Sequence, residues 1–187
     1  MRIEHFIADQ IRRAHTDTIE VRHAMVASTA TDRKPLANPP AVSIYELFSR
    51  EVHECAHAVA ALEGGARNIV VTIGADARGS CCFDPIRKSI DHVVVCLVGV
   101  IAEVRLRPSA LAVYAGGCFD FNSARLLLDM RRERNEWPHM GAEGAAQRAT
   151  DFVSVHWERI VGLALVLGRS GGTLCDADVR HFAKVSP

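Results

Sequence analysis

The sequence lacks an excess of either charge. It has 22 Lys and Arg residues against 22 Asp and Glu residues, so its formal net charge is zero with histidine neutral. Proteins that bind nucleic acid or anionic membrane surfaces usually carry a clear basic excess. We therefore expect no nucleic-acid partner and no membrane partner.

Long apolar runs are also missing. The longest, residues 93–102, is shorter than the roughly 20 residues that a membrane-spanning helix needs. The first residues, M-R-I-E-H-F, lack the apolar core of a signal peptide. None of the six cysteines forms a C-x-x-C pair. Together these absences predict a cytoplasmic protein with reduced thiols.

What is present is an ordinary globular composition, 49% hydrophobic and 24% charged over 187 residues. One segment stands apart, because residues 29–41 contain three prolines and read as a linker. We therefore divide the chain into two parts. Residues 1–40 are expected to form an N-terminal helical extension with a proline-containing linker, and residues 41–187 a single domain.

The spacing of apolar residues predicts a mainly α fold with a small sheet of two or three strands beside a central helix. Gly64 and Gly65 end that central helix, and a glycine-bearing loop is expected at residues 114–119. The expected helices are residues 3–28, 43–63, 86–106, 120–134 and 145–168, followed by a short one from Thr173. The expected strands are residues 68–74 and 80–83. Residues 138–144 are expected to separate two of the helices.

The central helix carries the motif V-H-E-C-A-H-A-V-A at residues 52–60. His53 and His57 are four residues apart, so on a helix both imidazoles leave the same face about one turn apart. Two such rings can bind one Zn²⁺ ion, and Glu54 can reach a water on that ion. The simpler interpretation is a hydrogen-bonded histidine pair in the core, without metal.

A catalytic zinc ion takes three protein ligands, and the motif supplies two. Glu103, in an apolar helix, and Asp120, after two glycines, are the candidates for the third. Cys118 is a weaker one. Without a metal, Asp120 would be a helix N-cap, and Glu103 a solvated residue near a helix end beside Arg105. The residues alone leave this choice open.

The motif and four later segments resemble, in the same order, the peptidase domain of the FtsH-type AAA zinc proteases. H-E-C-A-H-A resembles that family's H-E-A-G-H-A, and G-G-C-F-D-F-N-S-A resembles its T-G-A-x-N-D-L-x-x-A, with Phe119 in place of the asparagine. The five segments are residues 53–62, 70–85, 97–104, 116–124 and 163–179.

The resemblance implies a helical, zincin-like metallopeptidase domain with one Zn²⁺ ion. It makes Asp120 the third ligand beside His53 and His57, and places Glu103 near the site, where it orients a ligand or serves as the alternative one. The family's ATPase module and its G-x-x-x-x-G-K-[ST] loop are absent from this sequence. We therefore expect substrates that are peptides or unfolded protein segments, with room for a separate ATPase partner or a homo-oligomer.

The resulting hypothesis is a zinc metalloendopeptidase that hydrolyses peptide bonds independently of ATP. Zinc would lower the pKa of its bound water, and Glu54 would take the water's proton and deliver it to the leaving amine. An extended substrate would pair with the strand formed by Ser80, Cys81, Cys82 and Phe83. The alternative is a non-catalytic zinc-binding regulator or adaptor that keeps the peptidase fold.

Overall fold

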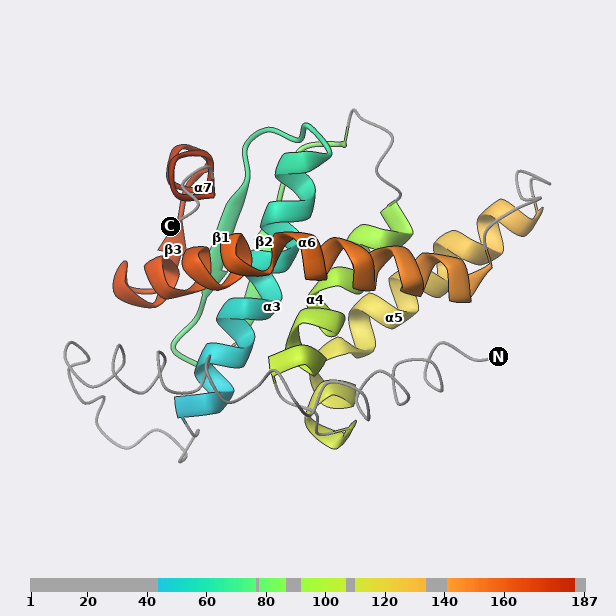
Figure 1. Ribbon diagram of the computed structural model, residues 1–187, viewed down its shortest axis with the longest axis horizontal. Coiled ribbons are helices and arrows are strands. Elements are labelled where there is room, and N and C mark those ends of the chain that lie inside the picture. Colours follow the sequence, from blue (N-terminus) through green and yellow to red (C-terminus); the bar gives the residue numbers. More distant parts are fainter. Residues whose placement is uncertain (1–43, 77, 87–91, 107–109, 134–140, 184–187) are drawn as a thin grey trace.

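The computed structural model of the protein describes residues 44–76, 78–86, 92–106, 110–133 and 141–183 (Figure 1). The predicted mainly α fold with a small sheet is confirmed. No helix within these ranges combines the length and apolar character needed to cross a membrane. In chain order the elements are α3 (Ile44–Glu63), β1 (Val70–Ile73), β2 (Gly79–Cys82), α4 (His92–Leu106), α5 (Ala110–Glu133), α6 (Ala142–Arg169), β3 (Thr173–Leu174) and α7 (Asp176–Phe182).

Helix α3 lies at the centre of the fold. It packs against α4, α6 and the sheet, while α6 runs across both α3 and α4 (Figure 1). A helix that is surrounded on several sides needs small residues where its neighbours approach. Four alanines of α3 are completely inaccessible to solvent: Ala56, Ala58, Ala60 and Ala61. The polar side chains of this helix are therefore held in a closely packed environment.

The sheet has three antiparallel strands in the order β2-β1-β3. A tight turn joins β1 to β2, in which the Gly74 N–H donates to the Arg78 carbonyl over 2.7 Å. On the other side of β1, the Ile73 N–H donates to the Gly172 carbonyl, also over 2.7 Å. Gly172 has φ +87°, and a Cβ there would lie 2.7 Å from the Ile73 oxygen, so the position favours glycine. Strand β2 thus forms one edge of the sheet.

The prediction of a loop at residues 114–119 is wrong, because this stretch lies inside α5. Glycine weakens a helix by about 1 kcal/mol relative to alanine, which packing can outweigh. Gly117 is buried against α4, and a Cβ there would lie 2.6 Å from Val100 Cγ2. The glycine permits close packing of the two helices. Asp120 is consequently in the interior of a helix, and its interpretation as an N-cap is wrong.

Helices α4 and α6 also begin at residues other than those predicted. The helix expected from Ile86 is α4, which begins at His92, and residues 84–86 are not helical. Asp84 is held beside the start of β1, because its N–H donates to the Arg67 carbonyl over 2.9 Å. Helix α6 begins within the predicted interruption, at Ala142, where Glu143 in the first turn favours a helix N-terminus.

The short helix expected from Thr173 is preceded by a strand. Thr173 and Leu174 pair with β1, about a hundred residues earlier, and α7 begins only at Asp176. The Asp178 carboxylate accepts a hydrogen bond from the Cys175 N–H over 3.0 Å, which caps this helix. Such a short strand cannot be predicted from its neighbouring residues, because its partner strand is so distant in the sequence.

Several predictions fall outside the described residues. They are the helix at 3–28, the linker at 29–41 and the start of the central helix at Ser43. The division into residues 1–40 and 41–187 therefore stays a prediction.

Candidate metal centre

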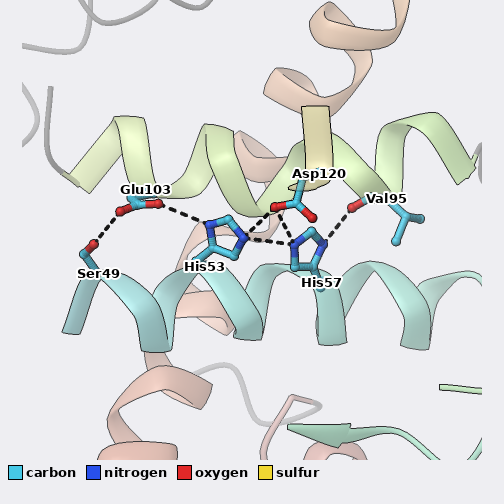
Figure 2. Close-up of polar contacts among 6 residues, drawn as sticks. All are labelled: Ser49, His53, His57, Val95, Glu103 and Asp120. Atoms are coloured by element: carbon cyan, nitrogen blue, oxygen red, sulfur yellow. Dashed lines mark hydrogen bonds and ion pairs between the residues drawn. The ribbon is translucent and has the colours of Figure 1, made fainter. Parts of the chain in front are cut away.

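The two imidazoles of α3 lie side by side on the face that meets α4 (Figure 2). The Nε2 atoms of His53 and His57 are 3.2 Å apart, and the ring centroids are 4.9 Å apart. Both residues are buried, with 3% and 8% of their surface exposed. Their four-residue spacing on a helix produces this arrangement directly.

Helix α4 supplies a hydrogen-bond acceptor for the Nδ1 atom of each ring. His57 Nδ1 is 2.8 Å from the carbonyl oxygen of Val95, which can only accept, so this nitrogen carries the proton. His53 Nδ1 is 3.2 Å from Glu103 Oε2, and an ionised carboxylate also only accepts. Both Nε2 atoms are therefore left to face a common point on the other side of the rings.

Asp120 of α5 approaches that point. Its Oδ2 atom is 2.9 Å from His53 Nε2 and 3.7 Å from His57 Nε2 (Figure 2). One ligand atom from each of the three side chains lies within 4.8 Å of the others. In the described part of the chain, no other group of three or more such side chains is so arranged. Two imidazoles and one carboxylate are a donor set of catalytic zinc sites, so this group could hold a metal ion.

The packing around the rings fits this interpretation. A Cβ on Gly99 of α4 would lie 2.4 Å from His57 Nε2 and 2.8 Å from His53 Nε2. No real side chain tolerates such distances, so any residue other than glycine would displace the imidazoles. Gly99 thus keeps open the space beside the two Nε2 atoms.

The charges of the metal-free site are strongly coupled. Burial alone would lower the pKa of His53, but the carboxylates of Asp120 and Glu103 outweigh burial and raise that pKa to about 9. Burial would raise the pKa of Asp120, but the hydrogen bond from His53 and the nearby imidazole of His57 hold it well below its usual range. Without metal, an imidazolium between two carboxylates therefore satisfies the site's polar atoms.

Glu54 lies next to the imidazole pair, against strand β2. It is 8% exposed, and a Cβ on Gly79 would lie 2.5 Å from its Oε1 atom. Burial raises the pKa of Glu54, while positive charge on His53 and His57 would oppose the rise. No hydrogen bond joins its carboxylate to another residue in the described ranges, so Glu54 can exchange a proton with a water or a substrate.

Glu103 lies on the opposite side of His53 from Asp120. It contacts Nδ1 of the ring, whereas Asp120 contacts Nε2, so the two carboxylates do not meet at one point (Figure 2). Glu103 is 2% exposed, and its Oε1 atom accepts a hydrogen bond from the Ser49 hydroxyl over 2.8 Å. The interpretation of Glu103 as a solvated residue near a helix end is therefore wrong.

The strand expected to bind substrate, Ser80 to Phe83, corresponds to β2 and the residue after it. Ser80 and Cys82 are exposed, whereas Cys81 faces the core. Strand β2 packs on α3, and Gly79 at its start contacts Glu54. The structure thus brings one end of this strand to the proposed catalytic carboxylate.

Four contributors to the site were missed by reasoning from the sequence: Ser49, Gly79, the carbonyl of Val95, and the space above Gly99. Ser49 precedes His53 by four residues and could have been found from that spacing. The carbonyl of Val95 acts through the backbone, which leaves no signal in the residue type. Gly79 and Gly99 are visible as glycines, but no local pattern shows which side chains they adjoin. The side chain of Cys118, the weaker ligand candidate, lies outside the described part of the structure.

Comparison with known proteins adds no assignment. No protein-family model matches the chain, and no curated protein matches it.

Proposed function

We propose that this protein is a zinc-dependent metalloendopeptidase with an FtsH-like, zincin-type catalytic domain. The observation that carries the proposal is the convergence of His53, His57 and Asp120 from two helices beside the buried carboxylate of Glu54. The ordered resemblance of five sequence segments to the FtsH-type peptidase domain supports it. A chance H-E-x-x-H motif would have no reason to meet a third ligand 63 residues later in the chain.

In this proposal His53, His57 and Asp120 hold one zinc ion. When bound, zinc polarises a substrate carbonyl and acidifies water. Glu54 accepts the proton from the attacking water and returns it to the leaving amine. Burial raises the pKa of Glu54, and a more basic carboxylate takes up the proton of the water more readily.

The substrate would be an extended segment of peptide or unfolded protein, paired with the edge of β2. No described strand pairs with the outer edge of β2, so its backbone groups can add a substrate strand. A folded protein could not present such a segment without being unfolded first. The 187 residues contain no nucleotide-binding loop, so an unfolding motor would lie outside them, for example in a separate ATPase partner.

The test combines metal analysis with a cleavage assay. We expect the purified chain to contain about one zinc per molecule and to cleave casein or an unstructured peptide. Glu54→Gln should keep the zinc and lose activity by about 10²–10⁴-fold, because it removes the proton acceptor. Glu63→Gln, on the same helix, is the matched control. Its carboxylate forms a partly exposed ion pair with Arg159, so activity should be retained.

Zinc binding without cleavage of any unstructured substrate would contradict the peptidase proposal. That outcome would favour the non-catalytic alternative, a zinc-binding regulator or adaptor with the same fold. Absence of stoichiometric metal from the intact chain would contradict both.

A further inference from the structure

Helix α5 carries a row of exposed apolar side chains on its outer face. Phe119, Leu126 and Met130 are 78%, 61% and 39% exposed. Their spacing of seven and four residues places all three within about 40° of one another around the helix axis. Among the side chains that the structure describes, no other helix carries more than one large exposed apolar residue. We call these three side chains the α5 patch.

The α5 patch lies opposite the face by which this helix joins the fold. On that inner face Ala124 is completely buried, and Phe121 and Leu128 pack on the core. A surface helix normally has one apolar face and one polar face. Helix α5 has two apolar faces, and among the described elements it packs chiefly on α4. A row of exposed apolar side chains of this kind marks an interaction surface.

The chain itself contains a segment with a complementary surface. Residues 3–28, which the sequence predicts to be helical, precede the described structure, which begins at Ile44. One face of such a helix carries four large apolar side chains: Ile3, Phe6, Ile7 and Ile11. An amphipathic helix gains most of its stability by packing its apolar face on a partner. This segment therefore needs an apolar surface of the kind that α5 exposes.

The tether allows the segment to reach α5. Residues 29–41, with three prolines, span up to about 40 Å when extended. That length is comparable with the width of a domain of this size. A segment attached in this way is present at an effective concentration in the millimolar range, which a second copy of the chain in dilute solution does not reach. The tethered segment is thus favoured over a second copy as the occupant.

We propose that residues 3–28 form an amphipathic helix that docks on the α5 patch of their own chain. The apolar face of the segment packs on Phe119, Leu126 and Met130 and removes both surfaces from water. Phe119 immediately precedes Asp120, so one end of the docking surface adjoins the residue that α5 contributes to the candidate metal centre. The docking itself requires neither zinc nor peptidase activity.

Hydrogen exchange of the full chain, followed by mass spectrometry, tests the docking. The amides of residues 3–28 should exchange at least about tenfold more slowly than in an unstructured chain. Phe119→Gln combined with Leu126→Gln should abolish that protection, because glutamine keeps the helix and removes the apolar contact. Val155→Gln is the matched control. Val155 is 77% exposed on α6, outside the α5 patch, so the protection should remain.

Substitutions in the segment test the same contact from the other side. Phe6→Gln combined with Ile7→Gln should expose the α5 patch and increase the binding of an apolar dye, anilinonaphthalene sulfonate. Arg12→Gln, on the opposite face of the expected helix, should bind the dye as the wild type does. Amide exchange in α3 and α6 should be the same in all variants, which separates lost docking from a general loss of structure.

Analytical ultracentrifugation over a range of concentrations distinguishes the tethered segment from a second copy. A monomer in which residues 3–28 are protected at every concentration supports the inference. Protection that falls on dilution, in step with the dissociation of a dimer, would overturn it. Exchange of residues 3–28 at the rate of an unstructured chain would also overturn it, as would protection that persists in the α5 double variant. These outcomes leave the proposed function intact, because none of them measures zinc binding or cleavage.

Discussion

The imidazole of His53 is the most constrained side chain of the site. Its Nδ1 atom faces Glu103 and its Nε2 atom faces Asp120, so both nitrogens meet a carboxylate. In the metal-free protein a proton on each nitrogen satisfies both neighbours, which is why the pKa rises to about 9 despite burial. A metal ion at Nε2 would take the place of one of these protons.

This charge arrangement predicts how the stability of the metal-free protein depends on pH. The folded-state pKa of His53, about 9, lies above the unfolded value of 6.5. The stabilisation is therefore fully present below about pH 6.5 and is lost as pH rises through 9. Urea unfolding in the presence of a chelator should show the free energy of unfolding falling over this range, by up to about 3 kcal/mol.

His53→Gln is the control for this pH dependence. It removes the titrating group, so the decline between these pH values should largely disappear. A wild-type free energy of unfolding that stays constant or rises over this range would contradict the assignment of a shared imidazolium.

At the scale of elements, strand β2 has an outer edge that no described strand covers, and it lies close to Glu54. The Gly74–Arg78 hydrogen bond and the register of β1 with β2 place the backbone groups of Ser80 and Cys82 toward β1. Those of Gly79 and Cys81 consequently point outward. They are the groups with which an extended substrate would pair.

Cys81→Pro should selectively weaken substrate binding. Proline removes the outward N–H and leaves the bonds between β1 and β2 intact, as it does in natural edge strands. We expect the KM for an unstructured peptide to rise about tenfold, the effect of losing roughly 1.4 kcal/mol of binding. Cys81→Ala keeps the N–H and removes the thiol, so it should bind substrate normally. Equal KM values for the proline and alanine variants would contradict strand pairing at this edge.

At the scale of the whole molecule, the site joins elements that otherwise have little direct contact. Helix α5 packs chiefly on α4, whereas α3 packs on α4, α6 and the sheet. Asp120 brings α5 to the imidazoles of α3. A metal held by all three side chains would therefore connect α3 to α5 across the edge of α4.

Zinc should therefore raise the melting temperature of the intact protein. A ligand at a thousand times its Kd stabilises the folded state by about 4 kcal/mol. Asp120→Ala leaves only the two imidazoles, so the zinc-induced increase, measured by calorimetry, should be much smaller. Asp129→Ala, which removes an exposed acid of the same helix, should keep the full increase. An unchanged increase in Asp120→Ala would exclude Asp120 as a ligand.

Local sequence patterns predicted much of the fold. The periodicity of apolar residues predicted α3, most of α4 and α6, and the two strands of the hairpin, because each depends on neighbours within a few residues. The errors have tertiary causes. Gly116 and Gly117 read as a loop, but packing of Gly117 on Val100 keeps that stretch helical. Strand β3 exists only because β1 lies beside it.

The motif at residues 53–57 is the part of the site that the sequence alone determined, because four-residue spacing on a helix places both imidazoles and Glu54 without help from elsewhere. Tertiary structure decided the rest. From the residues alone Glu103 and Asp120 were both candidates for the third ligand, and the resemblance favoured Asp120. The packing of α4 and α5 around His53 shows how the positions of the two carboxylates differ. Glu103 contacts Nδ1 of His53 and Asp120 contacts Nε2, because α4 and α5 approach the ring from opposite sides. The direction of that approach depends on contacts between residues about 50 to 67 positions apart, which no local pattern records.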